Sequence, residues 1–155
     1  MIFLPNRSRF CAILLISGVN LAGAAETLVL PGEGPDKLVE ALILAQPGDT
    51  LRLGEGHFDL SDGLSLDTDN VRVVGAGPDR TILSFKNQTG AGEGLLVTSD
   101  RVVLEDFAIE DTRGDGVKAK GSDQITFRNL RVEWTNGPDE KNGAYGIYPV
   151  SSETC

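Results

Sequence analysis

The stretch that decides the fold is Gly94-Leu-Leu-Val-Thr-Ser-Asp-Arg-Val-Val-Leu-Glu-Asp-Phe-Ala-Ile-Glu110, because it recurs as Gly116-Val-Lys-Ala-Lys-Gly-Ser-Asp-Gln-Ile-Thr-Phe-Arg-Asn-Leu-Arg-Val-Glu133. The opening glycines are 116 − 94 = 22 residues apart. After a one-residue insertion, Leu104 aligns with Phe127 at a shift of 127 − 104 = 23. Repetition at a short, nearly constant period is the sequence signature of a solenoid.

Looser copies flank these two, one around Val71–Gly77 and one that begins at Gly146 after an insertion from Asn136 to Tyr145. A unit of this length made of short strands cannot bury its own apolar side, whereas stacked units can. The sequence therefore predicts an all-β, right-handed parallel β-helix, a single-stranded solenoid whose rungs lie about 4.8 Å apart. A β-sandwich is the alternative, and it requires hairpins and tolerates a weaker repeat.

The repeat also predicts which side chains of neighbouring rungs stack. Four positions of the first copy are expected to point inward: Val102, Leu104, Phe107 and Ile109. We expect an inward stack, a corner pair and an exposed outer ion pair, namely Leu95–Val117–Ile147, Asp106–Asn129 and Glu105–Arg128. An exposed ion pair of this kind contributes about 0–1 kcal/mol.

The ends of the chain are expected to differ from the repeat. Residues 25–34 are assigned as a linker, and 35–155 as the β-helix domain. An amphipathic helix at 36–46 is predicted to cap the first rung, since an open β-helix end exposes apolar residues and unpaired strand edges. The chain stops at Cys155 within what should be the next rung, so we expect the sequence to be the N-terminal part of a longer protein.

The first 24 residues have the features of a secretory signal peptide. Arg7 and Arg9 precede the apolar stretch Phe10–Val19, and Ala22-Gly-Ala24 is a small-residue cleavage site. A membrane anchor is the alternative, but the apolar stretch is short for a bilayer. We expect export to the periplasm or beyond, and a protein that is not integral to the membrane.

Charge and cysteine content narrow the partners. The net charge is −9, and removal of the two leader arginines takes it to −9 − 2 = −11. Nucleic acid is not expected as a partner, because a polyanion would be repelled over most of this surface. Cys11 leaves with the leader and Cys155 is last, so the sequence does not predict a disulfide scaffold.

Several motifs resemble a bacterial family of exported parallel β-helix repeat proteins, which has the pectate-lyase-like fold. They are Pro47-Gly-Asp-Thr-Leu-Arg-Leu53, Val73-Val-Gly-Ala-Gly77, Thr81-Ile-Leu-Ser-Phe85, Gly94-Leu-Leu-Val97, Glu110-Asp-Thr-Arg-Gly-Asp-Gly116, Ile125-Thr-Phe-Arg-Asn129, Val132-Glu-Trp-Thr135 and Asn142-Gly-Ala-Tyr-Gly-Ile-Tyr-Pro149. The resemblance covers roughly residues 30–150. It implies the fold far more strongly than a function, and it implies a c-type cytochrome-like exported protein as a possible neighbour.

Outward-facing polar residues supply the candidate site. Lys118 is expected to stack between Leu96 and Tyr148 on one outer face. The predicted substrate-binding residues are Lys118, Lys120, Tyr148 and Trp134, because uronate chemistry needs a cation at the sugar carboxylate and an aromatic side chain can stack on the ring. The predicted metal ligands are Glu110, Asp111 and Glu133, because stacked like charges attract a cation such as Ca²⁺. The alternative is a solvated outer face in which these charges screen one another.

Two functions follow from these observations. The first is binding or processing of an acidic polysaccharide in the cell envelope, with catalysis left open. The second is a non-catalytic scaffold that docks another exported protein, such as the cytochrome-like neighbour. The sequence does not separate them.

Overall fold

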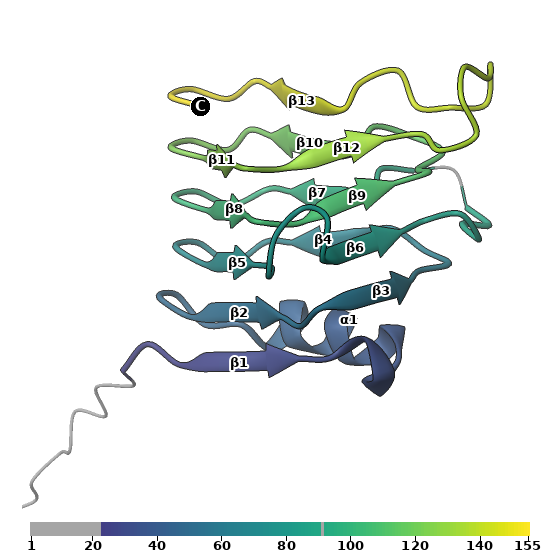
Figure 1. The fold of residues 1–155 in the computed structure, drawn as a ribbon. Helices are drawn as coiled ribbons and strands as arrows, with labels where there is room; N and C mark the ends of the chain where they lie inside the picture. Colours follow the sequence, from purple (N-terminus) through teal and green to yellow (C-terminus); the bar gives the residue numbers. More distant parts are fainter. Residues whose placement is uncertain (1–22, 91) are drawn as a thin grey trace, which may run out of the picture.

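The computed structural model describes residues 23–90 and 92–155. It contains three all-parallel sheets stacked in register, with one helix near the N-terminus (Figure 1). The predicted parallel β-helix is confirmed. The expected signal peptide at 1–24 falls almost entirely outside the described residues. No helix within the described residues is long and apolar enough to cross a membrane.

Each rung after the first contributes one strand to each sheet, and the first rung contributes β1 alone. The first rung holds β1 (Glu26–Val29), the 3-10 helix η1 (Pro31–Glu33) and α1 (Pro35–Leu44). The next four rungs hold β2 (Thr50–Leu53), β3 (Gly56–Asp59) and β4 (Leu64–Leu66); β5 (Arg72–Val74), β6 (Thr81–Ser84) and β7 (Leu95–Val97); β8 (Val103–Glu105), β9 (Ala108–Glu110) and β10 (Val117–Lys120); and β11 (Thr126–Arg128), β12 (Arg131–Glu133) and β13 (Ile147–Val150). We call the sheets A (β1-β2-β5-β8-β11), B (β3-β6-β9-β12) and C (β4-β7-β10-β13).

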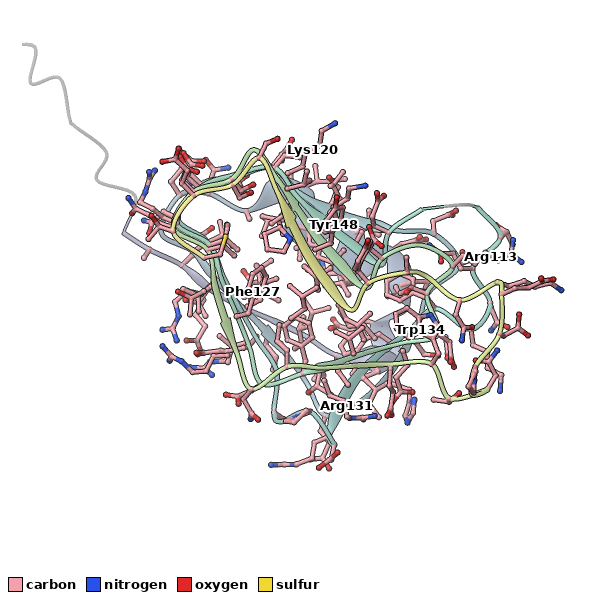
Figure 2. All side chains as sticks on the ribbon, turned by 90° about the horizontal axis from the view of Figure 1, so that it is seen from above. Arg113, Lys120, Phe127, Arg131, Trp134 and Tyr148 are labelled. Atoms are coloured by element: carbon pink, nitrogen blue, oxygen red, sulfur yellow. The ribbon has the colours of Figure 1, made fainter. Side chains whose placement is uncertain are left out.

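The β-helix winds in the right-handed sense. Seen from above, the upper rung passes from Phe127 through Arg131 and Trp134 to Tyr148, which is counterclockwise as the chain rises toward the viewer (Figure 2). This sense is the one that twisted parallel strands adopt in crossover connections. Because successive rungs are in register, the connections between sheets B and C lie above one another at one corner of the solenoid.

The predicted stacks are present. Leu95, Val117 and Ile147 are register partners in sheet C, and the Asn129 amide donates to the Asp106 carboxylate at 2.6 Å. The four predicted inward residues of the first copy are all at most 1% exposed. Ile147 is 37% exposed, because it lies in the last described rung and has no rung above it.

One expectation about the outer face of sheet A was wrong. Glu105 pairs with Arg128 at 3.0 Å as predicted, but its side chain is only 8% exposed. Arg72, from the rung below, contacts the other carboxylate oxygen of Glu105. The glutamate is therefore enclosed between two guanidinium groups, and a charge that is withdrawn from water requires such pairing.

The corner between sheets C and A repeats a short motif that the sequence analysis overlooked. A hydroxyl residue and an acid precede a residue in the left-handed region, with φ values of 58°, 56°, 59° and 55°, in Thr68-Asp-Asn70, Ser99-Asp-Arg101, Ser122-Asp-Gln124 and Ser152-Glu-Thr154. The carboxylates of Asp69, Asp100 and Asp123 each accept a backbone N–H of the next rung at 2.8–2.9 Å. These bonds offset the cost of the left-handed conformation in residues with a side chain.

The stretch assigned as a linker is part of the solenoid. β1 pairs in parallel with β2, and the Glu33 carboxylate accepts the N–H of Leu30 at 2.7 Å. The predicted cap is present as α1, which begins at Pro35 and buries Leu38, Ala41 and Leu42. The sequence analysis missed β1 because the strand is only four residues long, which is too short to show a clear alternation of apolar and polar residues.

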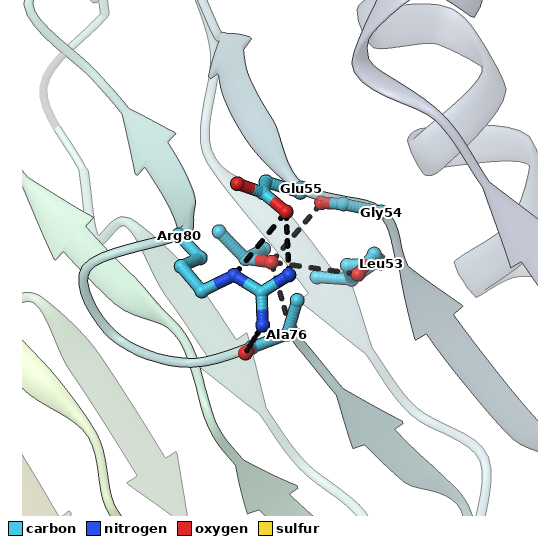
Figure 3. A network of polar contacts seen from close by, with 6 residues as sticks. Leu53, Gly54, Glu55, Ala76 and Arg80 are labelled. Atoms are coloured by element: carbon cyan, nitrogen blue, oxygen red, sulfur yellow. Dashed lines mark hydrogen bonds and ion pairs between the residues drawn. The ribbon is translucent and has the colours of Figure 1, made fainter.

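A polar network fixes the connection between β5 and β6 to the rung below (Figure 3). The Thr81 hydroxyl donates to the carbonyl of Gly54 at 3.0 Å and accepts the N–H of Ala76 at 2.8 Å. The Arg80 guanidinium binds the Glu55 carboxylate, with Nε at 3.2 Å, and donates to the Ala76 carbonyl at 3.4 Å. The connection between β5 and β6 is therefore bound to Gly54 and Glu55 of the rung below and to its own backbone at Ala76.

Glycine recurs immediately before every strand of sheet C, at Gly63, Gly94, Gly116 and Gly146. A Cβ atom at Gly63 would lie 2.5 Å from the Glu93 carbonyl oxygen, one at Gly94 would lie 2.7 Å from that of Gly116, and one at Gly116 would lie 2.6 Å from that of Gly146. Such distances are shorter than any ordinary contact of a carbon with a carbonyl oxygen. The corner between sheets B and C can therefore keep its rung spacing only where a side chain is lacking.

Gly116→Ala is expected to lower the free energy of unfolding by about 1–3 kcal/mol, because overpacking against backbone forces the rungs apart. Gly92→Ala is the control, since a Cβ there would meet nothing within 4 Å. Urea unfolding followed by circular dichroism measures both. Equal loss of stability in the two variants would contradict the close approach at Gly116.

Candidate functional site

Four connections join sheet B to sheet C, and the last three of them stack at one corner around a pocket of about 380 Å³, which we call the corner cleft. Its residues come from three successive rungs. The connection after β6 contributes Lys86, the one after β9 contributes Asp111, Thr112 and Arg113, and the one after β12 contributes Trp134, Thr135, Asn136, Lys141 and Asn142. Figure 2 shows Arg113 and Trp134 at this corner.

The cleft is lined by basic side chains that form no salt bridge within the described residues. The described residues contain 14 − 2 = 12 lysines and arginines, since the other two lie in the leader. Eight of them form salt bridges: Lys37, Arg52, Arg72, Arg80, Arg101, Lys118, Arg128 and Arg131. Four form none within the described residues, namely Lys86, Arg113, Lys120 and Lys141. Three of these four line the cleft.

Hydrogen bonds fix the backbone and the aromatic wall of the cleft. The Trp134 indole N–H donates to the carbonyl of Thr112 at 2.7 Å, which ties the last rung to the one below it. The N–H of Arg113 donates to the side-chain carbonyl of Gln88 at 2.9 Å, and its guanidinium donates to the Thr89 carbonyl at 3.3 Å. Gln88 is only 3% exposed. The cleft is therefore preorganised by contacts between three rungs.

The outer face of sheet C carries a second group of polar residues. Lys118 lies in register with Leu96 below and Tyr148 above, as predicted. Its ammonium is 2.8 Å from the Glu93 carboxylate, 3.9 Å from that of Asp115 and 5.8 Å from the centre of the Tyr148 ring. The charge expected to be free for a substrate is therefore already held by a glutamate.

This ion pair shifts the pKa values of both partners. The hydrogen bond from Lys118 lowers the pKa of Glu93, and the bond to Glu93 raises the pKa of Lys118. Both shifts favour the charged forms, so each partner stabilises the other between the two ordinary pKa values of 4.5 and 10.5.

The predicted metal ligands are engaged by other groups. Glu110 and Glu133 are register partners as expected, but the Arg131 guanidinium binds both, with Nη1 3.0 Å from Glu110. The Asp111 carboxylate accepts the N–H and the hydroxyl of Thr135 at 2.7 and 2.8 Å. Within residues 23–90 and 92–155, no group of three or more His, Cys, Asp and Glu side chains could hold a metal ion. The like charges are thus balanced by an arginine that the sequence analysis left out.

The predicted substrate-binding residues divide between two places. Trp134 lines the corner cleft, whereas Lys118, Lys120 and Tyr148 lie on β10 and β13 in sheet C. Sequence reasoning did not single out Lys86 or Lys141. A usable signal was present, because the last three of the four connections from sheet B to sheet C each carry a basic residue, and their shared corner follows from the repeat.

Comparisons with protein-family models, with curated proteins and with solved structures found no match for this sequence. Of the family resemblance, only the parallel β-helix fold is supported, and the three parallel sheets support it. A function has to be argued from the charges and contacts of the site.

Lys118→Met is expected to raise the Glu93 pKa toward its ordinary value of 4.5. Because the folded-state pKa of this carboxyl lies below its unfolded value, the stabilisation is present above pH 4.5 and disappears as the pH falls through the lowered pKa. The stability difference between the natural protein and the variant should shrink accordingly. NMR titration of the Glu93 carboxyl and urea unfolding across this pH range measure it.

Lys120→Met is the comparison variant, since Lys120 lies on the same strand and forms no salt bridge within the described residues. Its charge lowers the Glu93 pKa less than the hydrogen bond from Lys118 does, so a smaller rise of that pKa is expected. An unchanged Glu93 titration in Lys118→Met would show that another group lowers this pKa.

Proposed function

We propose that this protein binds an acidic polysaccharide in the cell envelope, after export directed by residues 1–24, and that the corner cleft is the binding site. The observation that carries the proposal is the placement of Lys86, Arg113 and Lys141 around one pocket, since these are three of the four cations in residues 23–90 and 92–155 that form no salt bridge. A chain with a net charge of −9 that keeps unpaired cations together in one place favours an anionic ligand there.

The chemistry of the cleft suits carboxylated sugars. Arg113 can meet a carboxylate through two parallel N–H groups, whereas the two lysines act as point charges. Trp134 supplies an apolar wall whose indole N–H is already satisfied by Thr112, so it is suited to pack against a sugar ring. The three rungs give one basic residue each, which fits a polymer that runs along the solenoid axis.

The proposal is for binding and does not extend to turnover. Asp111 is the one acid among the described lining residues of the cleft, and both of its carboxylate oxygens accept hydrogen bonds from Thr135. A general base must reach the proton it abstracts, and an engaged carboxylate is poorly placed for that role.

The double variant Lys86→Gln/Arg113→Gln is expected to weaken binding to polygalacturonate roughly 5- to 30-fold, at about 0.5–1 kcal/mol for each partly exposed ion pair. Lys37→Gln/Arg52→Gln is the matched control, because it removes one lysine and one arginine that are paired and lie away from the cleft. Isothermal titration calorimetry at two salt concentrations measures both. Equal weakening in the two double variants would leave only non-specific attraction and contradict the cleft.

A second candidate function is docking of another exported protein, and the distribution of exposed apolar side chains favours it. Seven large apolar side chains are exposed among the described residues, and five lie in the first rung: Leu28 in β1, Leu30 just after it, and Val39, Ile43 and Leu44 in α1. Patches of this kind on soluble proteins mark interaction surfaces. Ile43→Ser/Leu44→Ser should abolish co-purification of one defined exported partner while the cleft double variant retains it. Retention by both variants would exclude this surface.

A further inference from the structure

Two tyrosines form a stacked pair next to the corner cleft. The rings of Tyr145 and Tyr148 have centroids 4.6 Å apart and planes 18° apart. Tyr145 is 53% exposed, whereas Tyr148 is partly buried beneath it on β13. An aromatic ring that is half exposed and lies on another ring offers a free, flat face to the solvent.

The pair is held rigidly. Lys118 lies 5.8 Å from the Tyr148 ring centre on the rung below, and its ammonium is fixed by Glu93 at 2.8 Å. The backbone carbonyl of Tyr145 accepts the N–H of Gly116 at 2.9 Å. The face of Tyr145 is therefore presented on a backbone and a ring that are already in place, so little further conformational entropy is lost when a ligand stacks on it.

Tyr145 and the last wall of the cleft belong to the same connection, between β12 and β13. Asn142 lines the cleft and precedes Tyr145 by three residues, a span of at most roughly 11 Å. Between them, Gly143 packs so closely on the Gly114 carbonyl that it has no room for a side chain. A ligand that extends from Asn142 along this connection toward β13 thus meets the Tyr145 ring next.

We propose that the Tyr145–Tyr148 pair is a second subsite, which stacks on an uncharged face of a neighbouring sugar ring in the polymer whose carboxylate is held in the corner cleft. This inference rests on the proposed function. It specifies the ligand as an oligosaccharide, since the ligand has to place one carboxylate in the cleft and a neighbouring ring on Tyr145. It also assigns Lys118 as a residue that positions Tyr148, in place of a direct contact with substrate.

The test is the dependence of affinity on ligand length, with oligogalacturonates of one to six units as probes and the 155-residue chain as the protein. Trp134 is the single tryptophan, so its fluorescence reports occupancy of the cleft, while calorimetry reports affinity. In the natural protein, affinity is expected to rise with length until the ligand spans both subsites. Tyr145→Ala should weaken the longer oligomers roughly three- to tenfold and leave the monomer unchanged. Tyr145→Phe should restore the length dependence, because it keeps the stacking ring.

The outcomes separate the two proposals. Tyr145→Ala with the same length dependence as the natural protein would overturn the second subsite and leave the cleft intact. A natural protein that binds none of the oligomers, with unchanged Trp134 fluorescence, would overturn the proposed function itself. Circular dichroism of each variant shows whether a loss of affinity comes from unfolding.

Discussion

The structure depends on one constraint, which is that every rung must hydrogen-bond to its neighbours through three parallel sheets at once. Parallel strands lie about 4.8 Å apart, so all corners and side chains have to fit that spacing. The glycine column before sheet C and the acid-to-backbone bonds at the corner before sheet A are two solutions to it. Apolar residues in register then close the core, as Leu95 and Val117 do.

The same register creates an electrostatic problem on the outside, because equivalent residues of successive rungs lie directly above one another. Glu110 and Glu133 are stacked like charges, and Arg131 neutralises both. Glu105 is enclosed between Arg72 and Arg128. On these faces the cations serve the fold. Among the described residues, the cations without a salt bridge lie mainly in the connections at one corner, on loops that run outside the sheets.

That corner is also where the rungs differ in length. Between register-equivalent positions of sheets B and C the chain takes 95 − 82 = 13, 117 − 108 = 9 and 147 − 131 = 16 residues in the last three rungs, and the connection between β5 and β6 varies as well. Insertions there leave the sheets unchanged and build a cleft beside them. The arrangement separates a repetitive scaffold from a variable binding surface, which is how functional residues are commonly carried on rigid folds.

The sequence was enough to predict the solenoid, the 22-residue step between its two clearest copies, the cap helix and the residues that stack, because period-two strands within a short repeat admit few other arrangements. The longer step of 95 − 64 = 31 residues between β4 and β7 was not predicted. The sequence did not reveal β1 either, whose four residues belong to the solenoid only through their pairing with β2. Which of the described lysines and arginines lack a salt bridge is visible only in the folded structure. Lys118, singled out from its neighbours in sequence, is held by Glu93 from an adjacent rung, whereas Lys86, Arg113 and Lys141 converge from three rungs. Ion pairing depends on distances between side chains that are about 25 residues apart along the chain, and a linear pattern does not contain those distances.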